Sequence, residues 1–143
     1  MKTRSLAVLA VLIVGVAMAM PLGAQTLSLK ANIPFEFSFA GKTMPAGEYL
    51  LQSNAGSSTL QVRSLDGGAG ALSLGAHPIS YTGPRTGDAR ITFNKYGNSY
   101  FLSNVLNGYS GVSFDVPVSR TERELARTAS AQKFQVLGVL ARL

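Results

Sequence analysis

The chain has 143 residues, a formal net charge of +6 and no cysteine. Without cysteine, disulfide bonds and thiolate chemistry are excluded, so an apolar core must hold the fold together. A basic chain can suit nucleic acid, but two of the basic side chains lie at the extreme N-terminus and five lie in residues 119–143. The basic residues are not interleaved with exposed aromatics as in a nucleic-acid-binding stripe, so no nucleic-acid partner is expected.

Residues 1–24 have the pattern of a secretory signal peptide. A short basic head is followed by the uncharged apolar run 6–20 and by small residues that end at Ala24. This order of regions is typical of such signals, and the run is shorter than the roughly twenty residues that span a bilayer. We expect cleavage after Ala24, with Ala19 as the alternative, and export to the periplasm or the extracellular space.

Residues 25–118 alternate apolar and polar side chains with a period of two, which is the pattern of half-buried strands. Strands are expected at 27–33, 35–39, 48–53, 59–63, 69–74, 78–81, 90–96, 100–106 and 112–116. Turns are expected at 41–42, 45–47, 66–67, 97–98 and 107–108, and an open loop at 82–88. Eight or nine short strands at this spacing predict one all-β domain, either a small antiparallel β-barrel or a β-sandwich. Both architectures share the alternation, so the choice between them stays open.

The pattern changes after residue 118. Ser119 and Glu122 have the spacing of a capping box, which predicts a helix from about Arg120 to Lys133. The closing apolar run, 134–143, is too short to cross a bilayer, and we expect a last strand, a docked helix or a partner-binding tail. Residues 119–143 are therefore expected to be a C-terminal helix and apolar tail, without a transmembrane segment.

Catalytic and metal-binding patterns are weak in this sequence. No potential ligands lie at metal-binding spacing around the single histidine, His77, so neither a metal nor a cofactor is expected. Glu36 and Glu48 are the candidates for a hydrolytic carboxylate pair. Strand alternation points Glu36 outward, however, and Glu48 directly follows a turn. The sequence favours a protein that is not an enzyme, with a hydrolase as a distant third interpretation.

Three tyrosines are the candidate ligand-binding residues. Tyr96 and Tyr100 flank the turn at 97–98, and Tyr109 follows the next turn. A tyrosine ring can stack on a sugar while its hydroxyl forms a hydrogen bond. The competing interpretation is cross-strand aromatic packing, which stabilises hairpins by itself.

Four segments together resemble a known group of proteins. They are Asn-Ile-Pro-Phe-Glu-Phe at 32–37, Gly-Lys-Thr-Met-Pro-Ala-Gly-Glu-Tyr at 41–49, Phe-Asn-Lys-Tyr-Gly-Asn-Ser-Tyr-Phe-Leu at 93–102 and Ser-Arg-Thr-Glu-Arg-Glu-Leu-Ala at 119–126. This combination resembles the small secreted proteins, uncharacterised and all-β, that are typical of acidobacteria. The likeness covers about residues 28–127. It implies export and an all-β fold, and it carries no functional residues to this chain.

Two functions from different classes remain. The first is an exported, non-catalytic envelope or extracellular interaction protein, whose surface binds an envelope protein or a glycan. The alternative is a β-barrel that binds a small ligand or a glycan, because a barrel of about eight strands can hold one small ligand inside.

Overall fold

A computed structural model describes residues 26–54 and 56–141, and the expected signal peptide lies outside these described residues. Within them the chain forms eleven strands and one short helix, and the all-β prediction is confirmed. The elements are β1 (Thr26–Ile33), β2 (Phe37–Phe39), β3 (Lys42–Met44), β4 (Gly47–Asn54), β5 (Leu60–Ser64), β6 (Gly70–Ser73), β7 (His77–Ser80), β8 (Ala89–Tyr96), β9 (Ser99–Asn107), β10 (Val112–Asp115), α2 (Arg120–Ala126) and β11 (Gln132–Leu140).

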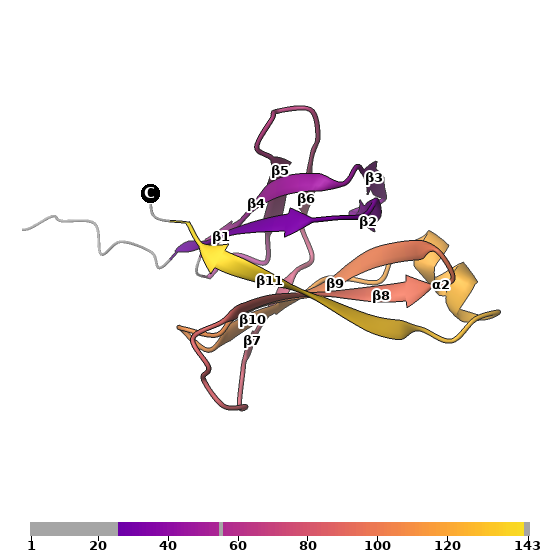
Figure 1. Cartoon of the computed structure of the whole chain (residues 1–143). Coiled ribbons are helices and arrows are strands. Elements are labelled where there is room, and N and C mark those ends of the chain that lie inside the picture. Colours follow the sequence, from indigo (N-terminus) through magenta and orange to yellow (C-terminus); the bar gives the residue numbers. More distant parts are fainter. Residues whose placement is uncertain (1–25, 55, 142–143) are drawn as a thin grey trace, which may run out of the picture.

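The strands form a single sheet in the order β3-β2-β9-β8-β11-β1-β4-β5-β6, with β10 on β9 and β7 on β10. Figure 1 shows this sheet folded over into two layers, and β11 crosses from the layer of β7 to β10 to the layer of β1 and β4 to β6. The strands at the two ends of this order, β3 and β6, approach each other: Lys42 Nζ on β3 donates to the carbonyl oxygen of Gly70 on β6 at 3.5 Å. The result is a nearly closed, barrel-like sheet.

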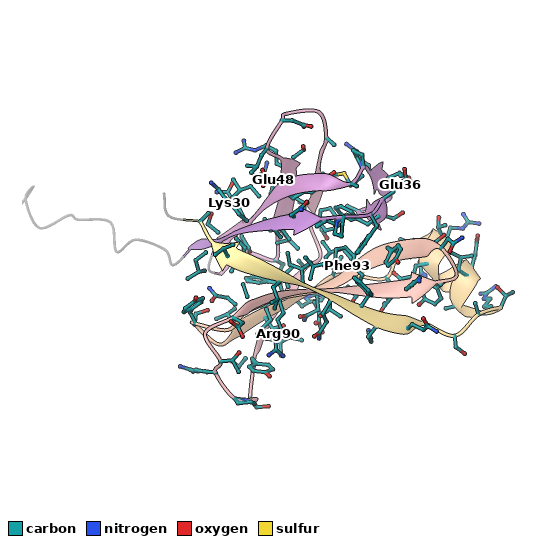
Figure 2. All side chains as sticks on the ribbon, in the orientation of Figure 1. Lys30, Glu36, Glu48, Arg90 and Phe93 are labelled. Atoms are coloured by element: carbon teal, nitrogen blue, oxygen red, sulfur yellow. The ribbon has the colours of Figure 1, made fainter. Side chains whose placement is uncertain are left out.

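Apolar side chains fill the space between the layers. Figure 2 shows Phe93 between them, whereas Arg90, three residues earlier on β8, points away. The Phe93 ring meets Phe35 and Phe37 edge-on, with centroids 5.0 and 5.4 Å apart. The largest fully buried side chains come from both layers: Tyr49, Phe37, Phe39, Phe93, Leu29, Ile33, Met44, Leu51, Leu60, Ile91, Val62 and Val105. The interior is therefore occupied by side chains, as the alternating pattern predicts.

The sheet contains a short strand that the sequence does not predict, and its first residue, Lys42, was expected in a turn. Residues 42–44 form β3, which pairs with β2 from Phe37–Met44 to Phe39–Lys42. The turn lies one residue earlier than expected, because Ala40 and Gly41 take φ values of 50° and 77°. Positive φ at both central residues is what a two-residue type I′ hairpin turn requires, so Lys42 is free to continue as a strand.

The turn between β5 and β6 is longer than the two residues expected at 66–67. Ser64 N donates to the Ala69 carbonyl at 2.8 Å and closes a wider loop. Gly67 has a positive φ of 79°, but Asp66 does not. Asp66 stabilises the loop through its side chain. The Asp66 carboxylate accepts from the Ser64 hydroxyl and from Gly68 N, and these hydrogen bonds lower its pKa.

The C-terminal segment needs two corrections. The helix begins as predicted, with Ser119 Oγ accepting from Glu122 N at 3.2 Å, but α2 ends at Ala126 and not near Lys133. Residues 132–140 form the strand β11, so of the three alternatives for the apolar run the last strand is right, and the run is no separate tail. Within residues 26–54 and 56–141, no helix has the length and apolar character needed to cross a membrane.

β11 belongs to both layers of the fold. It pairs with β8 from Gln132 to Gly138, and Val139 and Leu140 then pair with β1. The crossing is close, since a Cβ at Gly138 would lie 3.4 Å from the Lys30 carbonyl oxygen and from Ala89 Cβ. Among the described residues, 119–141 therefore belong to the same domain as the strands that precede them.

Candidate functional site

A row of polar side chains runs across the outer face of the layer formed by β7 to β11. Gln135 on β11 pairs with Thr92 on β8, Thr92 with Asn104 on β9, Asn104 with Asp115 on β10, and Asp115 with His77 on β7. Directly opposed residues in a sheet project to the same face. Five strands from distant parts of the sequence thus present their polar groups side by side.

A groove of about 460 Å³ lies over this row. Its lining residues are Thr92, Asn94, Ser103, Asn104, Asp115, Val116, Val118, Lys133 and Gln135. Ser103 is the extra residue of a β-bulge, because Thr92 pairs with Asn104 while Phe93 pairs with Leu102. Bulges redirect side chains and are common beside functional sites. Here the bulge adds a hydroxyl to the groove.

The Asn104 amide is held in one orientation at the centre of the groove. Its Nδ2 donates to Ser113 Oγ at 2.6 Å and to Asp115 Oδ1 at 2.5 Å. An asparagine amide has two N–H donors and one carbonyl acceptor. Both donors are used inside the protein, so the group that Asn104 can offer to a ligand is its carbonyl oxygen.

A second hydrogen-bond network closes the end of the groove next to α2. Glu122 is only 3% exposed, and its Oε1 accepts from Asn94 Nδ2 at 2.7 Å and from the Tyr96 hydroxyl at 3.3 Å. Lys133 Nζ in turn donates to Asn94 Oδ1. In a capping box the Glu122 carboxylate would accept from a backbone N–H at the start of the helix, but here it accepts from side chains on β8. It thereby fixes α2 against the turn end of β8 and β9 (Figure 1).

The three candidate tyrosines do not form one platform. Tyr96 is buried in the network just described and packs edge-on against Phe101, with centroids 5.9 Å apart. Tyr100 stacks on Phe35 at 3.9 Å, on the opposite face of the sheet. Tyr109 is 57% exposed and follows the other end of β9. Both Tyr96 and Tyr100 thus pack against other aromatic rings, and Tyr96 does so across the β8–β9 hairpin.

The remaining candidates stay apart as well. His77 is exposed at the edge strand β7, beside Asp115. In the part of the chain that the structure describes, no three His, Cys, Asp or Glu side chains come together as a metal site would require. Glu36 and Glu48 are both exposed, and Figure 2 shows them on the side of the molecule formed by β1 to β4, away from β8. Neither lines the groove.

Comparisons of the chain with protein-family models, with curated proteins and with solved structures found no match. The groove is therefore interpreted from its own geometry and chemistry.

Two buried tyrosines predict how the protein responds to alkaline pH. Burial raises the pKa of Tyr49 and of Tyr96, and the nearby carboxylates of Asp66 and Glu122 respectively raise them further. A raised tyrosine pKa means that the folded state favours the neutral ring. The corresponding stability is fully present below the ordinary tyrosine pKa of about 10 and is lost as the pH rises through the raised values.

We therefore expect the free energy of unfolding to fall above about pH 10, with late ionisation of two of the five tyrosines. Ultraviolet difference absorbance of the phenolate measures this titration. Tyr96→Phe is expected to remove one of the two late-ionising groups. Ionisation of all five rings in a single step in the folded protein would contradict the prediction.

Proposed function

We propose that this chain is an exported, non-catalytic protein of the cell envelope or the extracellular space that binds a partner through the polar groove on β8 to β11. The observation that carries the proposal is the pre-positioning of the groove's polar side chains. Asn104 is oriented by Ser113 and Asp115, and Lys133 is held by Asn94. Groups fixed before binding lose little conformational entropy when a partner arrives, which favours recognition.

The filled interior supports a surface partner over a ligand held inside the barrel. Phe93, Tyr49 and Phe37 are fully buried in the interior, and the Phe37 ring meets both of the other rings edge-on. A ligand inside would have to displace packed aromatic rings, at a cost of several kcal/mol. Recognition on the outer face requires no such rearrangement.

Export is supported by the N-terminal pattern and by the resemblance to small secreted proteins. The test is N-terminal sequencing of the protein recovered from outside the cytoplasm. We expect the mature chain to begin at Gln25, or at Met20 if cleavage follows Ala19. A cytoplasmic protein that retains Met1 would contradict the proposal.

Binding is tested best with point variants of the groove. Removing residues 119–143 would delete β11, the strand that joins the two layers, and would report on folding and not on the partner. Gln135→Ala removes an exposed amide from the groove, and Gln61→Ala removes an amide that is also exposed, from β5 in the other layer. The two variants form a matched pair.

Binding of the exported protein to washed envelopes of the producing cell is measured by sedimentation. We expect Gln135→Ala combined with Thr92→Ala to weaken binding by about tenfold or more, which corresponds to about 1.4 kcal/mol. Gln61→Ala is expected to leave it unchanged. If all these variants bind envelopes as tightly as the original chain does, the groove is not the surface that binds the partner.

A further inference from the structure

We infer that the groove binds a segment of an uncharged oligosaccharide chain. The inference rests on the proposed function and adds the chemical class of the ligand. It depends on the groove's charge balance, on its mixture of donors and acceptors and on its position over the middle of a sheet.

The groove carries one carboxylate and one ammonium group, and both are hydrogen-bonded to neighbouring amides. Asp115 accepts from Asn104, and Lys133 donates to Asn94. The two charges sit on β10 and β11, which are separated by β9 and β8, so three strand spacings of about 4.8 Å lie between them. A nucleic acid or another polyanion requires a surplus of positive charge. This lining has none and suits an uncharged ligand.

The other lining groups match hydroxyls. Each sugar hydroxyl is one donor and also an acceptor, so it needs both kinds of partner along the site. The groove offers the Asn104 carbonyl as an acceptor, the remaining N–H groups of Lys133 as donors, and the Thr92 and Ser103 hydroxyls as either. Val118, which is 48% exposed at the rim, offers apolar surface to the C–H face of a sugar ring.

The position of the groove argues against an extended peptide. Peptides commonly bind a sheet by adding a strand to a free edge, where backbone N–H and C=O groups are unpaired. Here the floor strands are internal: β8 is paired with β9 and β11, and β9 is paired with β8 and β10. A ligand over these strands therefore meets no free sheet edge. A chain that carries its own hydroxyls along its length fits such a surface.

Isothermal titration of the exported protein with a defined set of probes tests this inference. The uncharged probes are cellotetraose, maltotetraose and tetra-N-acetylchitotetraose, and the comparison probes are tetragalacturonate and tetra-alanine. We expect at least one uncharged probe to bind with a Kd of about 1 mM or tighter. Gln135→Ala is expected to weaken that binding by about fivefold or more, since it leaves a ligand hydroxyl without its partner. Gln61→Ala is expected to leave it unchanged.

The inference is overturned if no uncharged probe binds at about 10 mM, if an anionic or peptide probe binds as well as the best sugar, or if Gln61→Ala weakens binding as much as Gln135→Ala. Its failure is distinguishable from failure of the proposed function. Should the groove variants still lose envelope binding while no sugar binds, the ligand class is wrong and the groove remains the binding site. If no sugar binds and the groove variants bind envelopes as well as the original chain does, the groove is not the binding site.

Discussion

Replacing Val136 by aspartate is expected to destabilise the protein by at least about 2 kcal/mol, whereas the same change at the adjacent Leu137 is expected to stay within about 0.5 kcal/mol. Val136 points inward from β11 and packs against the core. Leu137 points outward and is 67% exposed. A carboxylate at Val136 would be placed against apolar side chains without a partner, while one at Leu137 would remain in water.

The two variants differ by one position in the same strand, so they separate the inward from the outward face of β11. Urea denaturation gives the free energy of unfolding for each. Truncation after Ala131, which removes the whole strand, is expected to abolish cooperative unfolding because the facing edges of β8 and β1 lose their partner. Equal stability of the two aspartate variants would mean that β11 does not close the barrel.

Replacing Glu122 by alanine is the second change with a large expected effect, about 2 to 4 kcal/mol of destabilisation. The buried Glu122 carboxylate accepts from both Asn94 and Tyr96, and its loss leaves two donors without an acceptor beneath α2. Glu124, two residues further along the helix, has a side chain that is 60% exposed and pairs with Arg120 at the surface. Exposed pairs of this kind contribute little, so Glu124→Ala is expected to cost less than about 0.5 kcal/mol.

Thermal unfolding of both variants measures the difference. Glu122→Gln keeps an acceptor oxygen at the same place and is expected to fall between the original protein and Glu122→Ala. Because Asn94 also holds Lys133, Glu122→Ala is expected to loosen the end of the groove and to weaken partner binding. The prediction fails if Glu122→Ala and Glu124→Ala are equally stable.

The strands of the hairpin β8–β9 could be predicted from the sequence, whereas β11 was one of three alternatives for the closing apolar run. Between residues 89 and 107 apolar and polar side chains alternate around a two-residue turn, and β8 and β9 follow that pattern closely. Residues 134–140 carry apolar side chains at inward and outward positions alike, so the period-two alternation of apolar and polar residues is lost there. Residues 127–131 suit a helix locally. Pairing of the following segment with β8 and β1 overrides that preference.

The groove could not be predicted from the sequence for a related reason. Alternation shows that Thr92 and Asn94 point outward, but it does not show which strands lie beside β8. Lys133 and Gln135 reach the groove from β11, about forty residues later in the chain, and no local sequence pattern predicts that β11 pairs with β8. Tyr96 and Tyr100 flank the same turn but lie on opposite faces of the sheet, and the sequence carries a signal of this. A two-residue turn opposes residue 96 to Ser99, which sends the next side chain along β9 to the other face.

Chemical-shift mapping decides between recognition on the outer groove and binding inside the barrel. The exported protein is labelled with ¹⁵N, and its spectrum is recorded as oligosaccharides released from the envelope of the producing cell are added. We predict that the largest shifts occur at the side-chain amides of Asn94, Asn104 and Gln135, while Gln61 and the backbone amides of the buried Tyr49 and Leu51 on β4 change little. Largest shifts around Tyr49 and Leu51, or at Tyr109, with an undisturbed groove, would contradict this.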